Sequence, residues 1–167
     1  MTAPSVTVDM GGGDYPSLPA MFLARAALGG QGPRYMAKRE GSYVTVSWAE
    51  CLNNVSEIAS GLIGMGLARE DRVAILSSTR AEWMEADLAA LAIGCVTVPI
   101  YPSSLAAECA YILVDSGART VVVENSEQAE KVKKAVRVGA DVDGVNLACT
   151  VENIVVVDGV AEGCVSL

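Results

Sequence analysis

From residue 72 onward, short continuous apolar runs alternate with longer segments in which apolar residues recur every three or four positions. Continuous apolar runs are typical of strands buried on both faces, and the longer period is typical of helices with one packed face. The pattern predicts strands at 73–76, 95–100, 120–123 and 153–157, and helices at about 79–93, 105–115 and 125–138. Strands joined by helical crossovers indicate an α/β fold, a parallel sheet with flanking helices.

The pattern is different before residue 72. We expect a flexible leader over 1–16, a short helix at 18–27, and a hairpin of two strands at 34–38 and 42–46 that turns at Glu40-Gly41. The leader holds Met10-Gly11-Gly12-Gly13-Asp14, which lacks the Lys-Ser/Thr that a phosphate loop requires. A further helix from Ser47 to about Gly64 carries one apolar stripe, formed by Trp48, Leu52, Val55, Ala59 and Leu62. Residues 139–150 are predicted to form a loop.

Three helix starts have capping signals. Ser47 with Glu50, and Thr79 with Glu82, have the spacing of capping boxes, in which the hydroxyl caps the first turn and the Glu reaches back. Asn125 or Ser126 caps the helix that runs to about 138.

The predicted strands all end in polar residues. These ends are Ser77-Ser78-Thr79, Tyr101-Pro102-Ser103-Ser104, Glu124-Asn125-Ser126 and Asp158-Gly159. Ligands of open parallel sheets lie outside the carboxyl ends of the strands, but the same residue types also cap helices. We expect helix capping to explain most of them.

A few side chains could be assigned chemistry, but each also has a structural explanation. Glu82, Glu85 and Asp87 resemble a general acid/base set, yet a cap explains Glu82 and a solvent-facing side explains the other two. Trp48 and Trp83 are expected to pack helices against the sheet. Tyr101, at a strand end, could face a cleft, but we expect it to be structural as well. We therefore assign no catalytic, cofactor-binding or metal-binding residue.

Composition narrows the functional classes. Apolar residues make up 51% and charged residues 19%, which excludes a disordered chain and leaves apolar surface that could pack against another segment. The formal charge is −8 with scattered Lys and Arg, which argues against nucleic acid as a partner.

The chain has no His, which excludes Ser-His and Cys-His catalysis and imidazole zinc sites within it. Five widely spaced Cys argue against a disulfide framework, and free thiols predict a cytoplasmic location.

An ordered run of motifs from Val44 to Val132 resembles adenylate-forming (AMP-binding) enzymes, most closely long-chain fatty acyl-CoA synthetases. The run comprises Val46-Ser47-Trp48-Ala49-Glu50, Ala59-Ser60-Gly61-Leu62, Gly66-Leu67, Asp71-Arg72-Val73-Ala74-Ile75, Glu82-Trp83, Gly94, Val98-Pro99-Ile100-Tyr101-Pro102, Glu108 and Tyr111-Ile112-Leu113. Glu70 stands where the family usually has Gly. The resemblance implies the N-terminal subdomain of the adenylate-forming enzyme fold, here 17–167 and truncated at its C-terminal end.

The resemblance also implies a reaction for the full-length parent. A fatty acid and ATP give acyl-AMP and pyrophosphate, and coenzyme A then displaces AMP, with Mg²⁺ on the phosphates. The family's phosphate loop, acidic motif, hinge and catalytic lysine have no counterpart here, so we expect these 167 residues alone to be inactive and to hold no cofactor. Two alternatives stay open: a fatty acyl-AMP ligase of an assembly line, and a non-enzymatic α/β interaction module. Expected partners are the fatty acid and the remainder of the parent chain, and the sequence leaves peripheral membrane association and a homo-oligomer open.

Overall fold

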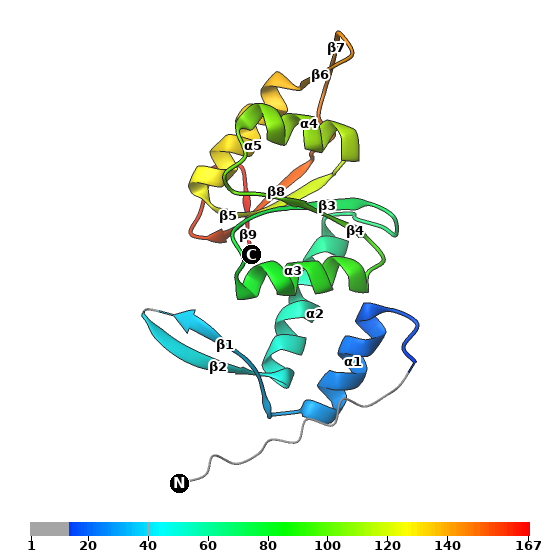
Figure 1. Ribbon diagram of the computed structural model, residues 1–167, viewed down its shortest axis with the longest axis vertical. Coiled ribbons are helices and arrows are strands. Elements are labelled where there is room, and N and C mark those ends of the chain that lie inside the picture. Colours follow the sequence, from blue (N-terminus) through cyan, green and yellow to red (C-terminus); the bar gives the residue numbers. More distant parts are fainter. Residues whose placement is uncertain (1–13, 40) are drawn as a thin grey trace.

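A five-stranded parallel sheet forms the centre of the computed structural model, which describes residues 14–39 and 41–167 (Figure 1). The strands are β3 (Arg72–Leu76), β4 (Val96–Ile100), β5 (Thr120–Asn125), β8 (Asn153–Asp158) and β9 (Val165–Ser166), in the order β4-β3-β5-β8-β9. The four predicted strands and their parallel pairing are confirmed. A fifth strand, β9, was not predicted and pairs in parallel with β8.

Helices cover both faces of this sheet, as predicted. On one face lie α2 (Trp48–Gly64) and α3 (Ala81–Ala92), and on the other lie α4 (Ala106–Ser116) and α5 (Ser126–Val138) (Figure 1). Alternate residues of each strand point to opposite faces, so Val73 and Ile75 join one buried cluster while Ala74 and Leu76 join the other. Each face buries its own apolar layer, which explains the continuous apolar runs in the sequence.

Two of the three predicted helix caps are present in the structure, and one is not. The Ser47 hydroxyl accepts a hydrogen bond from the Glu50 N–H at 3.1 Å, and the Asn125 side chain accepts one from the Gln128 N–H at 3.1 Å. The second capping box is wrong. Helix α3 starts after Arg80, whose guanidinium has no acceptor for a cap bond and donates to two carboxylates.

The N-terminal part of the described chain lies at the end of the molecule away from α4 and α5 (Figure 1). It contains α1 (Leu18–Gly29) and the predicted hairpin of β1 (Pro33–Arg39) and β2 (Ser42–Ser47), which pair antiparallel. Most of the predicted leader, and Glu40 of the predicted turn, lie outside the described residues. Trp48 packs against the buried cluster that contains Val73 and Ile75, and it also joins α2 to α1: its ring lies 6.3 Å from that of Phe22 and 4.9 Å from the Arg34 guanidinium.

The predicted loop at 139–150 contains a small hairpin instead. Strands β6 (Ala140–Val142) and β7 (Val145–Leu147) pair antiparallel around Asp143-Gly144. Both turn residues have positive φ, 53° and 81°. This is the two-residue turn that Asp-Gly favours in hairpins. The Asp-Gly dipeptide was therefore the signal in the sequence.

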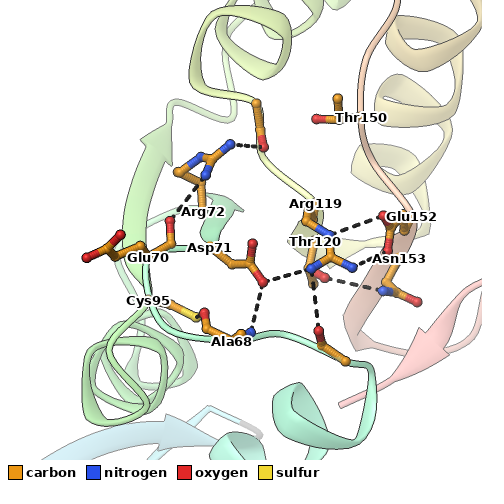
Figure 2. A network of polar contacts seen from close by, with 12 residues as sticks. Ala68, Glu70, Asp71, Arg72, Cys95, Arg119, Thr120, Thr150, Glu152 and Asn153 are labelled. Carbon is orange, nitrogen blue, oxygen red and sulfur yellow. Dashed lines mark hydrogen bonds and ion pairs between the residues drawn. The ribbon is translucent and has the colours of Figure 1, made fainter.

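Residues at the amino ends of the strands form a network of ion pairs (Figure 2). The Arg119 guanidinium lies 2.8 Å from Asp71 and 2.8 Å from Glu152, and Asp71 also accepts a hydrogen bond from the Ala68 N–H at 2.8 Å. That backbone bond, together with Arg119, lowers the pKa of Asp71. The network joins the starts of β3, β5 and β8 at the edge opposite the one where ligands of parallel sheets lie.

Glu70 adopts the left-handed backbone conformation, with φ of 71°, in the turn before β3. This explains why the family pattern has Gly here, since a non-glycine residue in this region costs about 1–2 kcal/mol. The side chain is exposed and makes a loose ion pair with Arg69 at 3.8 Å. We expect Glu70→Gly to raise the free energy of unfolding by about 1 kcal/mol in urea denaturation. Glu70→Ala, which removes the same ion pair but keeps a Cβ, is the control, and an equal gain in both variants would contradict the backbone explanation.

No helix of residues 14–39 and 41–167 is both long enough and apolar enough to cross a bilayer.

Candidate functional site

The polar strand ends meet at one side of the sheet, which we call the carboxyl edge: Ser77–Arg80, Tyr101–Ser104, Glu124–Ser126 and Asp158. Strand pairing fixes this arrangement, because Leu76 lies beside Ile100 on one side and Val123 on the other. One strand further along, Asn125 lies beside Asp158. Residues as far apart in the sequence as Arg80 and Asp158, 78 positions, are in contact here, and the carboxyl edge is the candidate site.

Glu124 organises the middle of the carboxyl edge. One of its carboxylate oxygens accepts a hydrogen bond from the Ser78 N–H at 2.8 Å and a longer one from the Ser77 hydroxyl at 3.5 Å. The Ser78 backbone bond lowers the pKa of Glu124, so this carboxylate is charged at neutral pH. Glu124 thus ties the loop after β3 to the end of β5.

Arg80 organises the side of the carboxyl edge nearest β8. Its guanidinium bonds the Glu82 carboxylate at 2.7 Å and makes two bonds to the Asp158 carboxylate, one of them at 3.0 Å. The bond to Asp158 raises the pKa of Arg80, and the same bond lowers the pKa of Asp158. Because two carboxylates already hold it, Arg80 is not available to neutralise a phosphate in this arrangement.

A hollow of about 480 Å³ lies at the ends of β3 and β4. The sides are formed by Ser77-Ser78-Thr79, Trp83 and the segment from Pro99 to Pro102. Tyr101 lines this hollow and is 80% exposed, so the expectation of a purely structural role is not supported. The loop that carries Tyr101 is tied to α5, because the Lys131 ammonium donates a hydrogen bond to the Pro102 carbonyl at 2.6 Å.

The three carboxylates of α3 do not form an acid/base set. Glu82 is explained by its ion pair with Arg80, not by a cap. Glu85 was expected to face solvent, but it is 4% exposed and accepts hydrogen bonds from the Tyr35 hydroxyl at 2.5 Å and the Asn54 amide at 3.0 Å. Asp87 is half-buried. Trp83 packs against the buried cluster that contains Val73 and Ile75, as predicted.

Two sets of residues were missed by reasoning from sequence. Tyr35 and Asn54 were not considered, and their contact with Glu85 joins β1, α2 and α3. The bond between Arg80 and Asp158 spans 78 residues. No periodicity signals such contacts, because they depend on how the elements pack.

The geometry supports binding and scaffolding rather than a complete catalytic centre. Within the described ranges, 14–39 and 41–167, no group of three His, Cys, Asp or Glu is arranged to hold a metal ion. Glu124 is held by Ser78 and Asp158 by Arg80, so no residue of the carboxyl edge is assigned to the Mg²⁺ that the resemblance implies for the parent. Burial raises the pKa of Cys51 to about 11, so this thiol is not an activated nucleophile at neutral pH.

Comparisons with known proteins agree with the motif pattern. Residues 23–162 match the family described as AMP-binding enzyme. The long-chain-fatty-acid–CoA ligase FadD15 of Mycobacterium bovis is 41% identical over 98 residues, which are 59% of this chain and 16% of that protein. The phosphinothricin tripeptide synthetase PhsB of Streptomyces viridochromogenes is 35% identical over 112 residues, 67% of this chain and 9% of that protein.

The fold comparison gives the same result. A fatty acyl CoA synthetase of Mycobacterium tuberculosis superimposes with a TM-score of 0.66 at 29% identity, over 84% of this chain and 26% of that one. The chain thus spans about a sixth to a quarter of the length of these two relatives. The family match covers most of the residues of the chain, and the sheet order and the ordered motifs agree with it. The chain therefore belongs to the AMP-binding enzyme family.

Proposed function

We propose that this chain is the N-terminal scaffold of an ATP-dependent fatty acid–CoA ligase. The reaction joins a carboxylate to ATP to give acyl-AMP and pyrophosphate, and coenzyme A then displaces AMP. The observation that carries the proposal is the family match over residues 23–162 together with 41% identity to a long-chain-fatty-acid–CoA ligase. The similarity to a tripeptide synthetase supports carboxylate activation as the chemistry that the relatives share.

The role proposed for these residues is structural support of that chemistry. Glu124, which accepts hydrogen bonds from Ser77 and Ser78, and Arg80, which is paired with two carboxylates, fix the loops of the carboxyl edge. The hollow beside Tyr101 is left open to the remainder of the enzyme. ATP, Mg²⁺ and coenzyme A are proposed for the whole protein. No catalytic step is assigned to a residue of this chain.

The proposed location is the cytoplasm. All five cysteines carry free thiols, and three of them are buried. Buried free thiols fit a reducing compartment. Association with the surface of a membrane is compatible with this location.

A chimera tests the proposed function. Residues 23–162 would replace the matching segment of the Mycobacterium bovis ligase, and fatty-acid-dependent ATP–pyrophosphate exchange and acyl-CoA formation would be measured. We expect the chimera to retain both activities and the 167-residue chain alone to show neither. A folded chimera that forms no acyl-adenylate would contradict the scaffold role. Acyl-adenylate formation without transfer to coenzyme A would favour the acyl-AMP ligase alternative.

A further inference from the structure

Two Asp-Gly dipeptides occur in the chain, Asp143-Gly144 and Asp158-Gly159. In such a dipeptide the glycine nitrogen can attack the side-chain carboxyl carbon of the aspartate, because glycine has no side chain to hinder the approach. The attack closes a five-membered succinimide ring and releases one molecule of water. Water then opens the ring at either carbonyl, and opening at the main-chain carbonyl leaves isoaspartate, in which the backbone runs through the former side chain.

The two glycines have the same surroundings. Gly144 and Gly159 have positive φ, 81° and 82°, and a Cβ added to either one would meet nothing within 4 Å. Both aspartates are exposed to solvent. Solvent access and the conformation of the glycine therefore do not distinguish the two dipeptides. What differs is the hold on each aspartate.

Arg80 holds the carboxylate of Asp158. The guanidinium donates hydrogen bonds to both carboxylate oxygens, one of them at 3.0 Å, and this contact lowers the pKa of Asp158. Ring closure requires the carboxyl group to rotate toward the Gly159 nitrogen and to be protonated, because its hydroxyl leaves as water. Both requirements oppose the ion pair. Asp158 also ends β8, in register with Asn125 of β5, so we expect this dipeptide to be protected.

Asp143 lies at the tip of the hairpin of β6 and β7, which projects from the molecule near α4 and α5 (Figure 1). In the part of the chain that the structure describes, its carboxylate has no hydrogen-bond or ion-pair partner. The backbone N–H of Gly144, which contains the attacking nitrogen, donates a hydrogen bond to the Asp141 carboxylate at 3.0 Å. Asp141 is thus placed to accept the amide proton. Each strand of the hairpin has only three residues, so it opens locally more readily than the central sheet.

We propose that Asp143-Gly144 is a site of spontaneous isoaspartate formation, with Asp141 as the proton acceptor and water as the only co-reactant. The Gly144 nitrogen forms a bond to the side-chain carboxyl carbon of Asp143 and gives its proton to Asp141. That proton passes to the hydroxyl that leaves as water, and a second water molecule opens the ring. The inference concerns the chemistry of the chain itself, so it stands or fails independently of the proposed ligase function.

The modification would disrupt the hairpin. Isoaspartate has one more carbon atom in the backbone, so a two-residue turn can no longer pair Val142 with Val145. The hairpin is tied to the end of α5, where the Asn146 amide donates a hydrogen bond to the Val138 carbonyl at 3.2 Å. An aged chain would therefore differ from a new one at this end of α5. An enzyme that methylates isoaspartyl carboxylates would find its substrate at the exposed turn.

The test ages the 167-residue chain at neutral pH and then cleaves it with trypsin and a glutamate-specific protease. Cleavage after Arg137, Glu152 and Glu162 separates the two dipeptides into peptides 138–152 and 153–162. Isoaspartate in each peptide is measured by the transfer of a labelled methyl group from S-adenosylmethionine by an isoaspartyl methyltransferase. We expect about tenfold or more isoaspartate in 138–152 than in 153–162, because release of Asp158 from Arg80 breaks charge-assisted hydrogen bonds.

Three variants separate the proposed causes. Asp143→Glu moves the carboxyl group one carbon too far for a five-membered ring, so it should abolish the signal in 138–152 whether or not the hairpin keeps its shape. Asp141→Ser keeps an oxygen that can accept from the Gly144 N–H but removes the basic carboxylate, so the signal in 138–152 should fall. Arg80→Gln frees Asp158 and should raise the signal in 153–162 alone.

The outcomes that overturn the proposal are distinct. Aged chain with no isoaspartate in 138–152, or with as much in 153–162, would show that the hold on each aspartate does not decide its reactivity. A signal in 138–152 that persists in Asp143→Glu would place the modification at another residue. A signal that Asp141→Ser leaves unchanged would remove Asp141 as the proton acceptor.

Discussion

Replacing Glu85 by alanine is expected to lower the free energy of unfolding by about 3–5 kcal/mol, a large part of the stability of an ordinary domain. The Glu85 carboxylate is buried and accepts hydrogen bonds from the Tyr35 hydroxyl and the Asn54 amide. Without it, the partly buried Tyr35 hydroxyl and Asn54 amide lose their acceptor, and a cavity opens between β1, α2 and α3. Chemical denaturation followed by circular dichroism measures the change.

Conservative variants separate lost hydrogen bonds from lost volume. Glu85→Gln keeps the shape and one acceptor oxygen, so we expect a smaller loss, about 1–2 kcal/mol. Tyr35→Phe combined with Glu85→Gln should show non-additive losses, because the two side chains are in direct contact. The control is Asp87→Ala, a half-buried carboxylate on the same helix, which should change stability by less than about 1 kcal/mol. Equal losses for Glu85→Ala and Asp87→Ala would show that Glu85 does not join the three elements.

The second large effect is expected at Gly29, the last residue of α1. A Cβ there would lie 2.2 Å from Cδ1 and 2.4 Å from Cγ of Trp48, far inside contact distance. The indole cannot easily move, because it is packed against Phe22 and the Arg34 guanidinium. We expect Gly29→Ala to destabilise the protein by about 3 kcal/mol, the upper part of the range for overpacked sites.

Tryptophan fluorescence in a Trp83→Phe background reports directly on Trp48. The Gly29→Ala variant should show a red-shifted emission in the folded state, because α1 no longer covers the ring. The matched control is Gly64→Ala at the end of α2, where a Cβ meets nothing within 4 Å. That substitution should leave stability unchanged or raise it by up to about 1 kcal/mol through helix propensity. An unchanged Trp48 emission in Gly29→Ala would mean that the helix end adjusts without loss.

The local elements were predictable because their signals are local. Continuous apolar runs identified β3, β4, β5 and β8, and Ser47 and Asn125 marked two helix starts through bonds to residues three positions away. The hairpin at β6 and β7 was missed only because its Asp143-Gly144 signal was not used. Strand β9 has two residues, too short for any periodicity to indicate.

The candidate site was only partly predictable. The polar strand ends followed from the α/β pattern, since parallel strands present their carboxyl ends at one edge. Their partners did not follow: Arg80 lies between the two residues of the predicted Thr79–Glu82 capping box, yet it bonds an aspartate 78 residues away. Tyr101 was identified as a strand-end residue, but its exposure in the hollow depends on how the loops of β3 and β4 are placed.

By itself, the sequence determined the class of fold, the positions of most helices and strands, and the resemblance to AMP-binding enzymes, because periodicity, caps and motif order are carried by residues close together in the chain. The tertiary structure alone decided that Glu85 is buried, that Trp48 packs α1 against α2, and that Arg80 is held by two carboxylates. It also left Leu28 and Tyr43 exposed to solvent. Burial and pairing depend on which distant surfaces meet when the sheet and helices pack, and spacing along the chain does not contain that information.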